Sequence, residues 1–365
     1  MEIFERILQG AIEAGASDVH LKIGAPVIFR IAGELVPVDA PPPAAEWMQT
    51  VLGQIVPAHL RARLDAEHEV DFAYTPPGGG RFRVNVFQQR GGYVLALRLV
   101  KTAVRTFAQL HLPETLRRIA ESESGIVLIT GATGSGKSTT LAAMIDHINS
   151  TARKHIITLE DPIEFLFEDK QSVIEQREVG LDTASFDSGL KNVLRQDPDI
   201  LVIGEMRDAA SVVAAMSAAN IGHLVISTLH TVDAAKSVQR ILEFFPANER
   251  EQARQQFATA LRAVVCQRLV RTQAAEQRPA LEILTNNAAV TKIIHTGALD
   301  KLPSAIELGG GEGMQTFNMA LHALASAGHI TQAEALANSP SPESLKMRFQ
   351  GVTLNETRRI LGARE

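Results

Sequence analysis

The first hundred residues contain short stretches in which apolar and polar positions alternate. Apolar residues recur at helical spacing from Ile3 to Ile12, and Gly15 marks the expected end of this helix. Strands are predicted, with turns rich in glycine and proline between several of them, at residues 19–23, 27–31, 34–38, 70–74, 81–88 and 93–100. A helix is expected at about 46–64, after the stiff break at Ala40-Pro-Pro-Pro43. The pattern in residues 1–100 therefore predicts an α+β domain.

The pattern changes at about Pro113, where continuous apolar runs begin to alternate with helical stretches. These runs lie at residues 126–130, 155–159, 200–204 and 224–228. Because such runs are typical of a mostly parallel sheet buried on both faces, the fold class is α/β. We expect a linker at 101–112, an α/β core at 113–285 and a mainly helical region at 286–365. That last region is broken by glycines at 309–313, and its final helices are predicted at 331–337, 343–349 and 354–361.

Length and composition narrow the class of protein. A chain of 365 residues is too long for one typical core. Its 45% hydrophobic and 21% charged residues, with a mean hydropathy of +0.03, are ordinary for a soluble globular protein. The net charge of −5 makes nucleic acid a poor default partner. No stretch approaches 18 apolar residues, and the acidic start excludes a signal peptide. We expect a cytosolic protein, or one docked to a membrane machine from the cytosolic side.

The one cysteine, Cys266, lies in an apolar stretch at 261–269 that we interpret as helical. A buried spectator is the expected role of this residue. A single cysteine permits neither a disulfide within the chain nor a zinc site built from Cys-x-x-Cys pairs.

A nucleotide-binding loop is predicted directly after the apolar run at 125–130. Residues 131–139 read GATGSGKST, which is G-x-x-x-x-G-K-[ST], and a helix-prone stretch follows at 138–145. Small residues let successive backbone N–H groups turn inward around phosphates, and the helix N-terminus adds partial positive charge. The lysine can reach the β- and γ-phosphates, and the serine hydroxyl after it can ligate Mg²⁺. The residues expected to hold the nucleotide, ATP with Mg²⁺, are Gly131, Ala132, Thr133, Gly134, Ser135, Gly136, Lys137, Ser138 and Thr139.

Further polar groups follow other apolar strands. Residues 199–205 form an apolar run that ends in Glu205, where an acid near Mg²⁺ is expected. Glu164 belongs to the acidic stretch 160–164, and His230 ends the run at 224–230. The alternatives are a surface acid that caps the next turn, a solvated acidic turn and a structural histidine.

The chain resembles the PilT-like members of the type II/IV secretion-system ATPases, the motors of type IV pili. The resemblance covers nearly the whole chain and rests on ordered motifs at residues 15–21, 80–87, 131–139, 158–165, 199–208 and 222–231. It implies an N-terminal PAS-like domain, a RecA-like core and a hexameric ring. The partners it implies are further copies of the chain, an inner-membrane platform protein and a paralogous pilus motor, with the protein at the inner face of the cytoplasmic membrane.

The resemblance also implies roles for individual residues. Lys137 and Ser138 would hold phosphate and Mg²⁺, Glu205 would act as general base or orient water, Glu164 would support the metal or the water, and His230 would contact the end of the nucleotide. Two arginines, Arg83 and Arg98, match those that reach the bound γ-phosphate. From the residues alone, the favoured interpretation is that they are partners in salt bridges on a strand surface. Two weaker candidates of the same type are Arg195 and Arg207.

One stretch departs from the family pattern. Where PilT-type motors have a sequence close to A-I-R-N-L-I-R-E-G-K, residues 289–298 read AVTKIIHTGA. The apolar positions and Gly297 remain, so a helix packed on the core is expected, but the two arginines, the acid and the last lysine are replaced. That stretch is tied to retraction, so ATP hydrolysis is better supported than retraction itself. The four-cysteine zinc insert and the extra N-terminal domain of the assembly motors are not expected.

The predicted function is an ATP-hydrolysing hexameric motor that drives pilus retraction through nucleotide-dependent domain rotation. Three alternatives stay open: a PilU-like accessory motor, a secretion ATPase of the same superfamily, and a nucleotide-gated scaffold that barely hydrolyses ATP.

Overall fold

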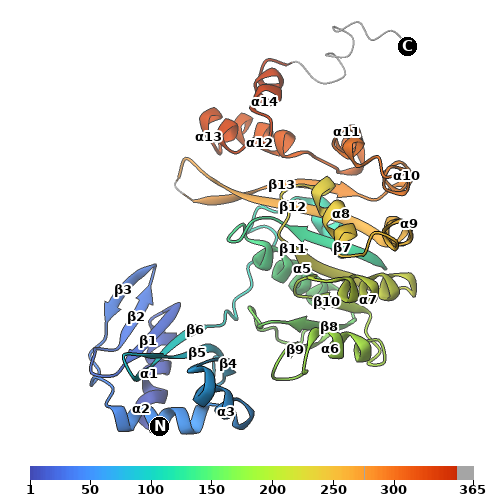
Figure 1. Cartoon of the computed structure of the whole chain (residues 1–365). Coiled ribbons are helices and arrows are strands. Elements are labelled where there is room, and N and C mark those ends of the chain that lie inside the picture. The colour runs from blue at the N-terminus through green and yellow to red at the C-terminus, as the bar shows by residue number, and fades with distance from the viewer. Residues whose placement is uncertain (275, 352–365) are drawn as a thin grey trace, which may run out of the picture. The chain divides into compact units, whose positions relative to one another are not determined.

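The structure is a computed structural model that describes residues 1–274 and 276–351 (Figure 1). The chain folds into two compact units. Residues 1–103, 160–167 and 177–185 form the first, and residues 104–159, 168–176 and the described residues from 186 onward form the second. The first unit is therefore built from three separate segments of the chain.

The first unit contains an antiparallel sheet in the order β3-β2-β1-β6-β5-β4. Phe4 and Leu8 from one helix and Met48 from another are fully buried in the core beside strand residues such as Val84 and Leu95. The alternating pattern of the sequence predicted these strands, whose inward positions are buried. The elements are α1 (Glu2–Glu13), β1 (Asp18–Lys22), β2 (Ile28–Ile31), β3 (Glu34–Pro37), α2 (Ala45–Ile55), α3 (Ala58–Glu67), β4 (Glu69–Tyr74), β5 (Phe82–Gln89) and β6 (Gly92–Leu99).

The single helix expected at 46–64 is wrong, since two helices, α2 and α3, occupy this region. Pro57 separates them and lies at the N-cap of α3. Proline has no N–H to donate into a preceding turn, and it pushes the residue before it toward extended backbone. Val56 accordingly adopts φ −72° and ψ 120°.

A sheet of seven strands, in the order β13-β12-β7-β11-β10-β8-β9, forms the centre of the second unit (Figure 1). Strands β7, β11, β10 and β8 pair in parallel, β12 pairs in parallel with β7, and β13 is antiparallel to β12. The four predicted apolar strands are confirmed. The elements up to this sheet's last strand are α4 (Glu114–Ala120), β7 (Gly125–Thr130), α5 (Lys137–Thr151), β8 (His155–Glu160), β9 (Val173–Glu178), α6 (Phe186–Val193), β10 (Ile200–Ile203), α7 (Ala209–Asn220), β11 (Leu224–Leu229), α8 (Ala234–Glu243), α9 (Arg250–Ala260), β12 (Leu261–Arg271) and β13 (Gln277–Thr285).

The helical interpretation of the stretch around Cys266 is wrong, because these residues form β12. Cys266 pairs with Thr130 of β7 on one side and with Glu282 of β13 on the other. A strand buried on both faces shows a continuous apolar run, which periodicity cannot distinguish from a buried helix. The spectator reading of the cysteine agrees with its full burial, which raises the pKa of the Cys266 thiol well above its usual value.

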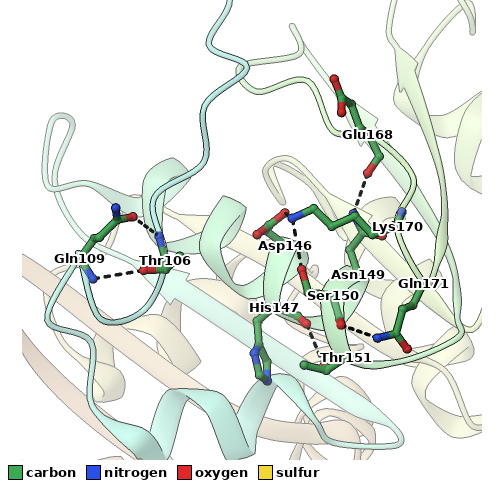
Figure 2. A network of polar contacts seen from close by, with 10 residues as sticks. All are labelled: Thr106, Gln109, Asp146, His147, Asn149, Ser150, Thr151, Glu168, Lys170 and Gln171. Atoms are coloured by element: carbon green, nitrogen blue, oxygen red, sulfur yellow. Dashed lines mark hydrogen bonds and ion pairs between the residues drawn. The ribbon is translucent and has the colours of Figure 1, made fainter.

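The segment 101–112, expected to be a linker, has no helix or strand, apart from an isolated bridge between Lys101 and Phe165. Phe107 is nonetheless buried, and its ring meets that of His147 on α5 at a centroid distance of 5.3 Å. The turn around it is closed by reciprocal hydrogen bonds between Thr106 and Gln109 (Figure 2). The second half of this segment is therefore packed on the second unit.

Helices follow the sheet: α10 (Ala288–Thr296), the 3₁₀ turn η1 (Leu299–Lys301), α11 (Leu302–Leu308), the 3₁₀ turn η2 (Gly309–Glu312), α12 (Phe317–Ser326), α13 (Gln332–Ala337) and α14 (Pro342–Phe349). The predicted helices at 331–337 and 343–349 are confirmed as α13 and α14. The expected helix at 354–361 lies outside the described residues. Instead of an open break, the first glycines of 309–313 form a short 3₁₀ turn. Within the part of the chain that the structure describes, no helix is long and apolar enough to cross a membrane.

Candidate nucleotide-binding site

The glycine-rich loop at 131–136 joins β7 to α5, as the motif predicted. Gly131 has φ 149°, and a Cβ there would lie 2.4 Å from the backbone oxygen of Gln267. Gly136 is the left-handed N-cap of α5, and its added Cβ would lie 2.7 Å from Nε2 of Gln267. Both positions therefore require glycine for conformation and for space.

Lys137 is the first residue of α5 and is 8% exposed. Its Nζ donates to the backbone oxygens of Gly131 at 2.8 Å and Ala132 at 3.1 Å, which holds the ammonium beside the loop. The N-cap of α5, Gly136, makes no side-chain capping hydrogen bond. The positive end of the dipole of this 15-residue helix therefore lies at the loop. The loop, the ammonium and the helix end together form a cradle whose charge and shape suit phosphate groups.

Two other predicted residues lie beside this cradle. His230 directly follows β11, and Glu205 lies two residues beyond β10. Nε2 of His230 is 3.4 Å from Oε1 of Glu205, and Nδ1 of His230 is 3.5 Å from Nζ of Lys137. The tautomer with its hydrogen on Nε2 suits both contacts, because Nε2–H then faces a carboxylate while Nδ1 accepts from the ammonium. Adjacent parallel strands thus bring Lys137, His230 and Glu205 into one row.

The weaker arginine candidates differ in their surroundings. The Nε of Arg207 lies 2.8 Å from Oε2 of Glu205, so it pairs with the same carboxylate that faces His230. Arg195 lies just after α6, and its backbone N–H donates to the oxygen of Asn192. Only Arg207 joins the row of predicted residues directly.

The other two predicted arginines lie side by side on the sheet of the first unit. Arg83 of β5 is the register partner of Arg98 of β6. Arg98 Nε lies 2.9 Å from Asp18, Arg83 Nε lies 3.8 Å from Asp71, and the arginine side chains are 71% and 48% exposed. These are the ion pairs that the strand-surface reading predicts. The expected contact of either arginine with a γ-phosphate stays a prediction.

Glu164 is exposed on the loop 160–167, which belongs to the first unit. Glu178 holds this loop in place. Its Oε2 accepts hydrogen bonds from the backbone N–H of Ile163 at 3.2 Å and from Arg81 at 3.1 Å. The backbone N–H of Leu166 also donates to the oxygen of Lys101. This loop therefore has a defined support, while the role of Glu164 toward metal or water stays a prediction.

Gln267 on β12 was not predicted, although it contacts the loop directly. Its Nε2 donates to the backbone oxygen of Ser135 at 2.7 Å, and its Oε1 accepts from the Thr140 hydroxyl at 2.7 Å. The available signal was a polar pair, Gln267 and Arg268, inside an apolar run that must be buried. The helical interpretation of that run hid the signal.

The fold and the nucleotide-binding loop agree with the comparisons to known proteins. The chain belongs to the family described as Type II/IV secretion system protein, whose profile matches residues 1–299. It is 39% identical over 344 residues to the "Type IV pilus retractation ATPase PilT" of Pseudomonas aeruginosa, covering 94% of this chain and 100% of that protein. It is also 39% identical to the "Type IV pilus ATPase PilU" of the same organism, covering 95% of this chain and 91% of that protein.

A solved structure gives the same result. The crystal structure of the pilus retraction motor PilT with bound ADP superposes with a TM-score of 0.85 at 41% identity, covering 94% of this chain and 98% of that one. The resemblance to the PilT-like members of the type II/IV secretion-system ATPases is therefore confirmed.

Proposed function

We propose that this chain is an ATP-hydrolysing, ring-forming motor that retracts a type IV pilus. The observation that carries the proposal is the row formed by Lys137, His230 and Glu205 beside a loop that requires glycine at residues 131 and 136. Such a row supplies a phosphate anchor and a carboxylate that can orient water, which are the parts a P-loop ATPase needs. The similarity to PilT, which covers 94% of this chain and 100% of that protein, supports retraction as the work done.

The residues divide the chemistry between them. Backbone N–H groups of the loop and the ammonium of Lys137 bind the phosphates, and the Ser138 hydroxyl at the start of α5 would hold Mg²⁺. Bound there, Mg²⁺ would supply positive charge to neutralise the phosphates. Glu205 orients the attacking water or accepts its proton, and His230 holds Glu205 in place from one side while Arg207 does so from the other. Glu164 supports the metal or water from the loop 160–167.

Mechanical work requires a second part of the protein to sense the γ-phosphate. We assign this role to Arg83 and Arg98, in a PAS-like domain at residues 1–100 that a linker at 101–112 joins to a RecA-like core at 113–285 and a helical region at 286–365. Arginine forks bind phosphate oxygens in a bidentate manner, so loss of the γ-phosphate would release one domain from the other. Hydrolysis is thereby converted into domain rotation.

The proposed partners follow from this role. Six copies of the chain form the ring, which docks on an inner-membrane platform protein at the cytoplasmic face of the membrane, with a paralogous pilus motor as a further partner. Nucleic acid is not among the partners, in keeping with the net charge of −5.

One observation favours a second function, that of a PilU-like accessory motor. Helix α10 packs on the core through Val290 and Ile294, as expected from the retained apolar positions. Its polar positions, however, carry Thr291, His295 and Thr296 where the family's retraction motors have charged residues. The chain's 39% identity to PilU is as high as that to PilT.

A deletion strain scored for surface pili separates these functions. Excess pili after deletion support retraction, whereas loss of pili would show an assembly role and contradict the proposal. An accessory motor gives a weaker excess, which appears fully only when the paralogous motor is also removed. Steady-state phosphate release by the purified protein separates a motor from a scaffold that binds ATP and barely hydrolyses it.

A further inference from the structure

Gln267 occupies the space directly behind the phosphate loop. It is 3% exposed, and its side-chain amide lies between the backbone oxygen of Ser135 and the hydroxyl of Thr140. Its own backbone oxygen and its Nε2 are the atoms that exclude a Cβ at Gly131 and at Gly136. One residue of β12 therefore touches the start of the loop, its last turn and the first turn of α5.

The contact with the Ser135 carbonyl also sets the direction of the next N–H group, because the peptide group is planar and trans. In such a group the carbonyl of one residue and the N–H of the next point in opposite directions. The Ser135 carbonyl points at Gln267, so the Gly136 N–H points away from Gln267, toward the face of the loop on which we place the phosphates. A peptide that rotated freely would turn this donor out of the cradle, and the two glycines that flank Ser135 give the backbone that freedom.

The amide is itself held in one orientation. Thr140 donates its hydroxyl hydrogen to Oε1, which leaves Nε2 facing the Ser135 carbonyl. A flipped amide would place oxygen against oxygen at that carbonyl. The backbone of β12 is fixed on both sides, since Cys266, the preceding residue, pairs with β7 and with β13.

We propose that Gln267 is a positioning residue for phosphate binding, which fixes the Ser135–Gly136 peptide with its N–H directed at the nucleotide. This inference rests on the nucleotide-binding part of the proposed function and extends it to a residue outside the loop. Because Gln267 lies behind the loop, its effect on binding passes through the peptide that it holds.

The test is Gln267→Glu, which keeps size and shape but replaces the donor that faces Ser135. As a carboxylate this side chain repels the carbonyl, whereas as a protonated acid it can still donate through O–H. We expect ADP affinity to fall by about tenfold or more where the acid is ionised, and the deficit to grow as pH rises from about 6 to about 9. KM for ATP should rise in parallel while kcat changes much less, because the cradle binds substrate and transition state alike.

Asn149→Asp is the matched control, at the other end of α5. The Asn149 amide is also buried, donates to a backbone oxygen, that of Glu168, at 2.8 Å, and accepts from the backbone N–H of Lys170 at 3.0 Å (Figure 2). This change removes the same kind of donor far from the loop, so ADP affinity should match that of the wild type at every pH. An equal deficit in Asn149→Asp, or no deficit in Gln267→Glu across the pH range, would overturn the proposal.

If circular dichroism shows that Gln267→Glu is not folded, a second pair of variants tests the proposal. Thr140→Val removes the hydroxyl that orients the amide and should weaken ADP binding several-fold, while Thr140→Ser should restore it. Unchanged affinity in Thr140→Val would contradict the proposal. If the wild type binds ADP but releases no phosphate from ATP, the motor function fails, and the ADP affinities still decide the role of Gln267.

Discussion

At the scale of single residues, the carboxylate of Glu205 lies between two basic side chains. One oxygen faces His230 and the other faces Arg207, so neither oxygen is free to rotate away from the strand ends. A carboxylate fixed in this manner can hold a water molecule in one direction, which a solvated acid on a turn cannot do.

Glu205→Gln should keep ATP binding and lower turnover by about 10²-fold or more, since a positioned acid or base contributes roughly 10²–10⁴. Lys137→Ala should instead weaken binding itself. Phosphate release and nucleotide affinity, measured on the same preparations, check both outcomes. Asp208→Asn is the control, because Asp208 caps α7 through the N–H of Ser211 and asparagine caps equally well. Near wild-type turnover in Glu205→Gln would show that another group positions the water.

Asp18 gives a second prediction, on stability. Burial raises the pKa of Asp18, but hydrogen bonds from Ser17 and Arg98 and the nearby charge of Arg98 outweigh burial and leave the pKa lowered. A lowered pKa in the folded state stabilises the protein above the ordinary value of 3.8, and this contribution is lost as pH falls through the folded value. Arg98→Ala should therefore cost about 0–1 kcal/mol at neutral pH and less at about pH 3. Urea unfolding at both pH values measures the difference, and a larger cost in acid would refute the assignment.

The same arginines distinguish surface pairing from a phosphate clamp. If Arg83 and Arg98 bind the γ-phosphate, alanine at either position lowers kcat at least about tenfold and blunts discrimination between ATP and ADP, with folding intact. Lysine should rescue poorly because its ammonium lacks the planar fork. Arg63→Ala, which removes an exposed ion pair with Glu67 on α3, controls for loss of surface charge. Full activity in both alanine variants would remove the pair from the site.

At the scale of elements, helix α10 is capped at its start by Asn287, the residue before it. Asn287 accepts from the backbone N–H groups of Ala289 and Val290, both at 3.0 Å, and Gly297 ends the helix in the left-handed conformation. Asn287→Ala should lower the free energy of unfolding by about 1 kcal/mol, whereas Asn287→Ser, which keeps a capping oxygen and adds no charge beside Glu312, should lower it less. Urea denaturation of the three proteins tests this, and an alanine variant as stable as the wild type would show that packing alone holds α10.

Elements with a clear local signal were predicted from the sequence, and elements without one were not. The strands of the first unit alternate, and β7, β8, β10 and β11 are apolar runs bounded by turns, so each carries its own local signal. Strand β12 pairs with β7, which lies far away in the sequence, and β13 lies at the sheet edge and pairs with β12. A run such as Ala263-Val-Val-Cys266 fits a buried helix equally well. The break at Pro57 was readable but outweighed by the helical spacing on either side.

The candidate site, like the fold, was predicted from the sequence only where its residues belong to a local motif. Motif residues at strand ends were found because parallel strands bring their carboxyl ends to one edge, which predicted that Lys137, Glu205 and His230 approach each other. Gln267 was missed because its importance arises from the contact between β12 and the loop, which sequence spacing does not encode.

At the scale of the whole molecule, the chain has one phosphate loop, and its two candidate sensing arginines lie in another unit. We expect hexamers, more fully populated with an ATP analogue and Mg²⁺, because a ligand held between parts of an assembly stabilises that assembly by mass action. Light scattering at micromolar protein measures the mass with and without nucleotide. A mass of one subunit under both conditions would contradict the ring.

The three-segment construction of the first unit limits how the protein can be cut. Glu178 is 5% exposed, and its carboxylate is satisfied by Arg81 and by the loop that carries Glu164. A truncated protein that starts after residue 103 would keep this buried acid and lose its guanidinium partner, together with the oxygen of Lys101 that holds Leu166. The N-terminal region is thus not an exchangeable module. A chimaera that imports residues 1–103 from a relative must also import the matching residues 160–167 and 177–185. Substitutions in these three segments should accordingly co-vary among relatives.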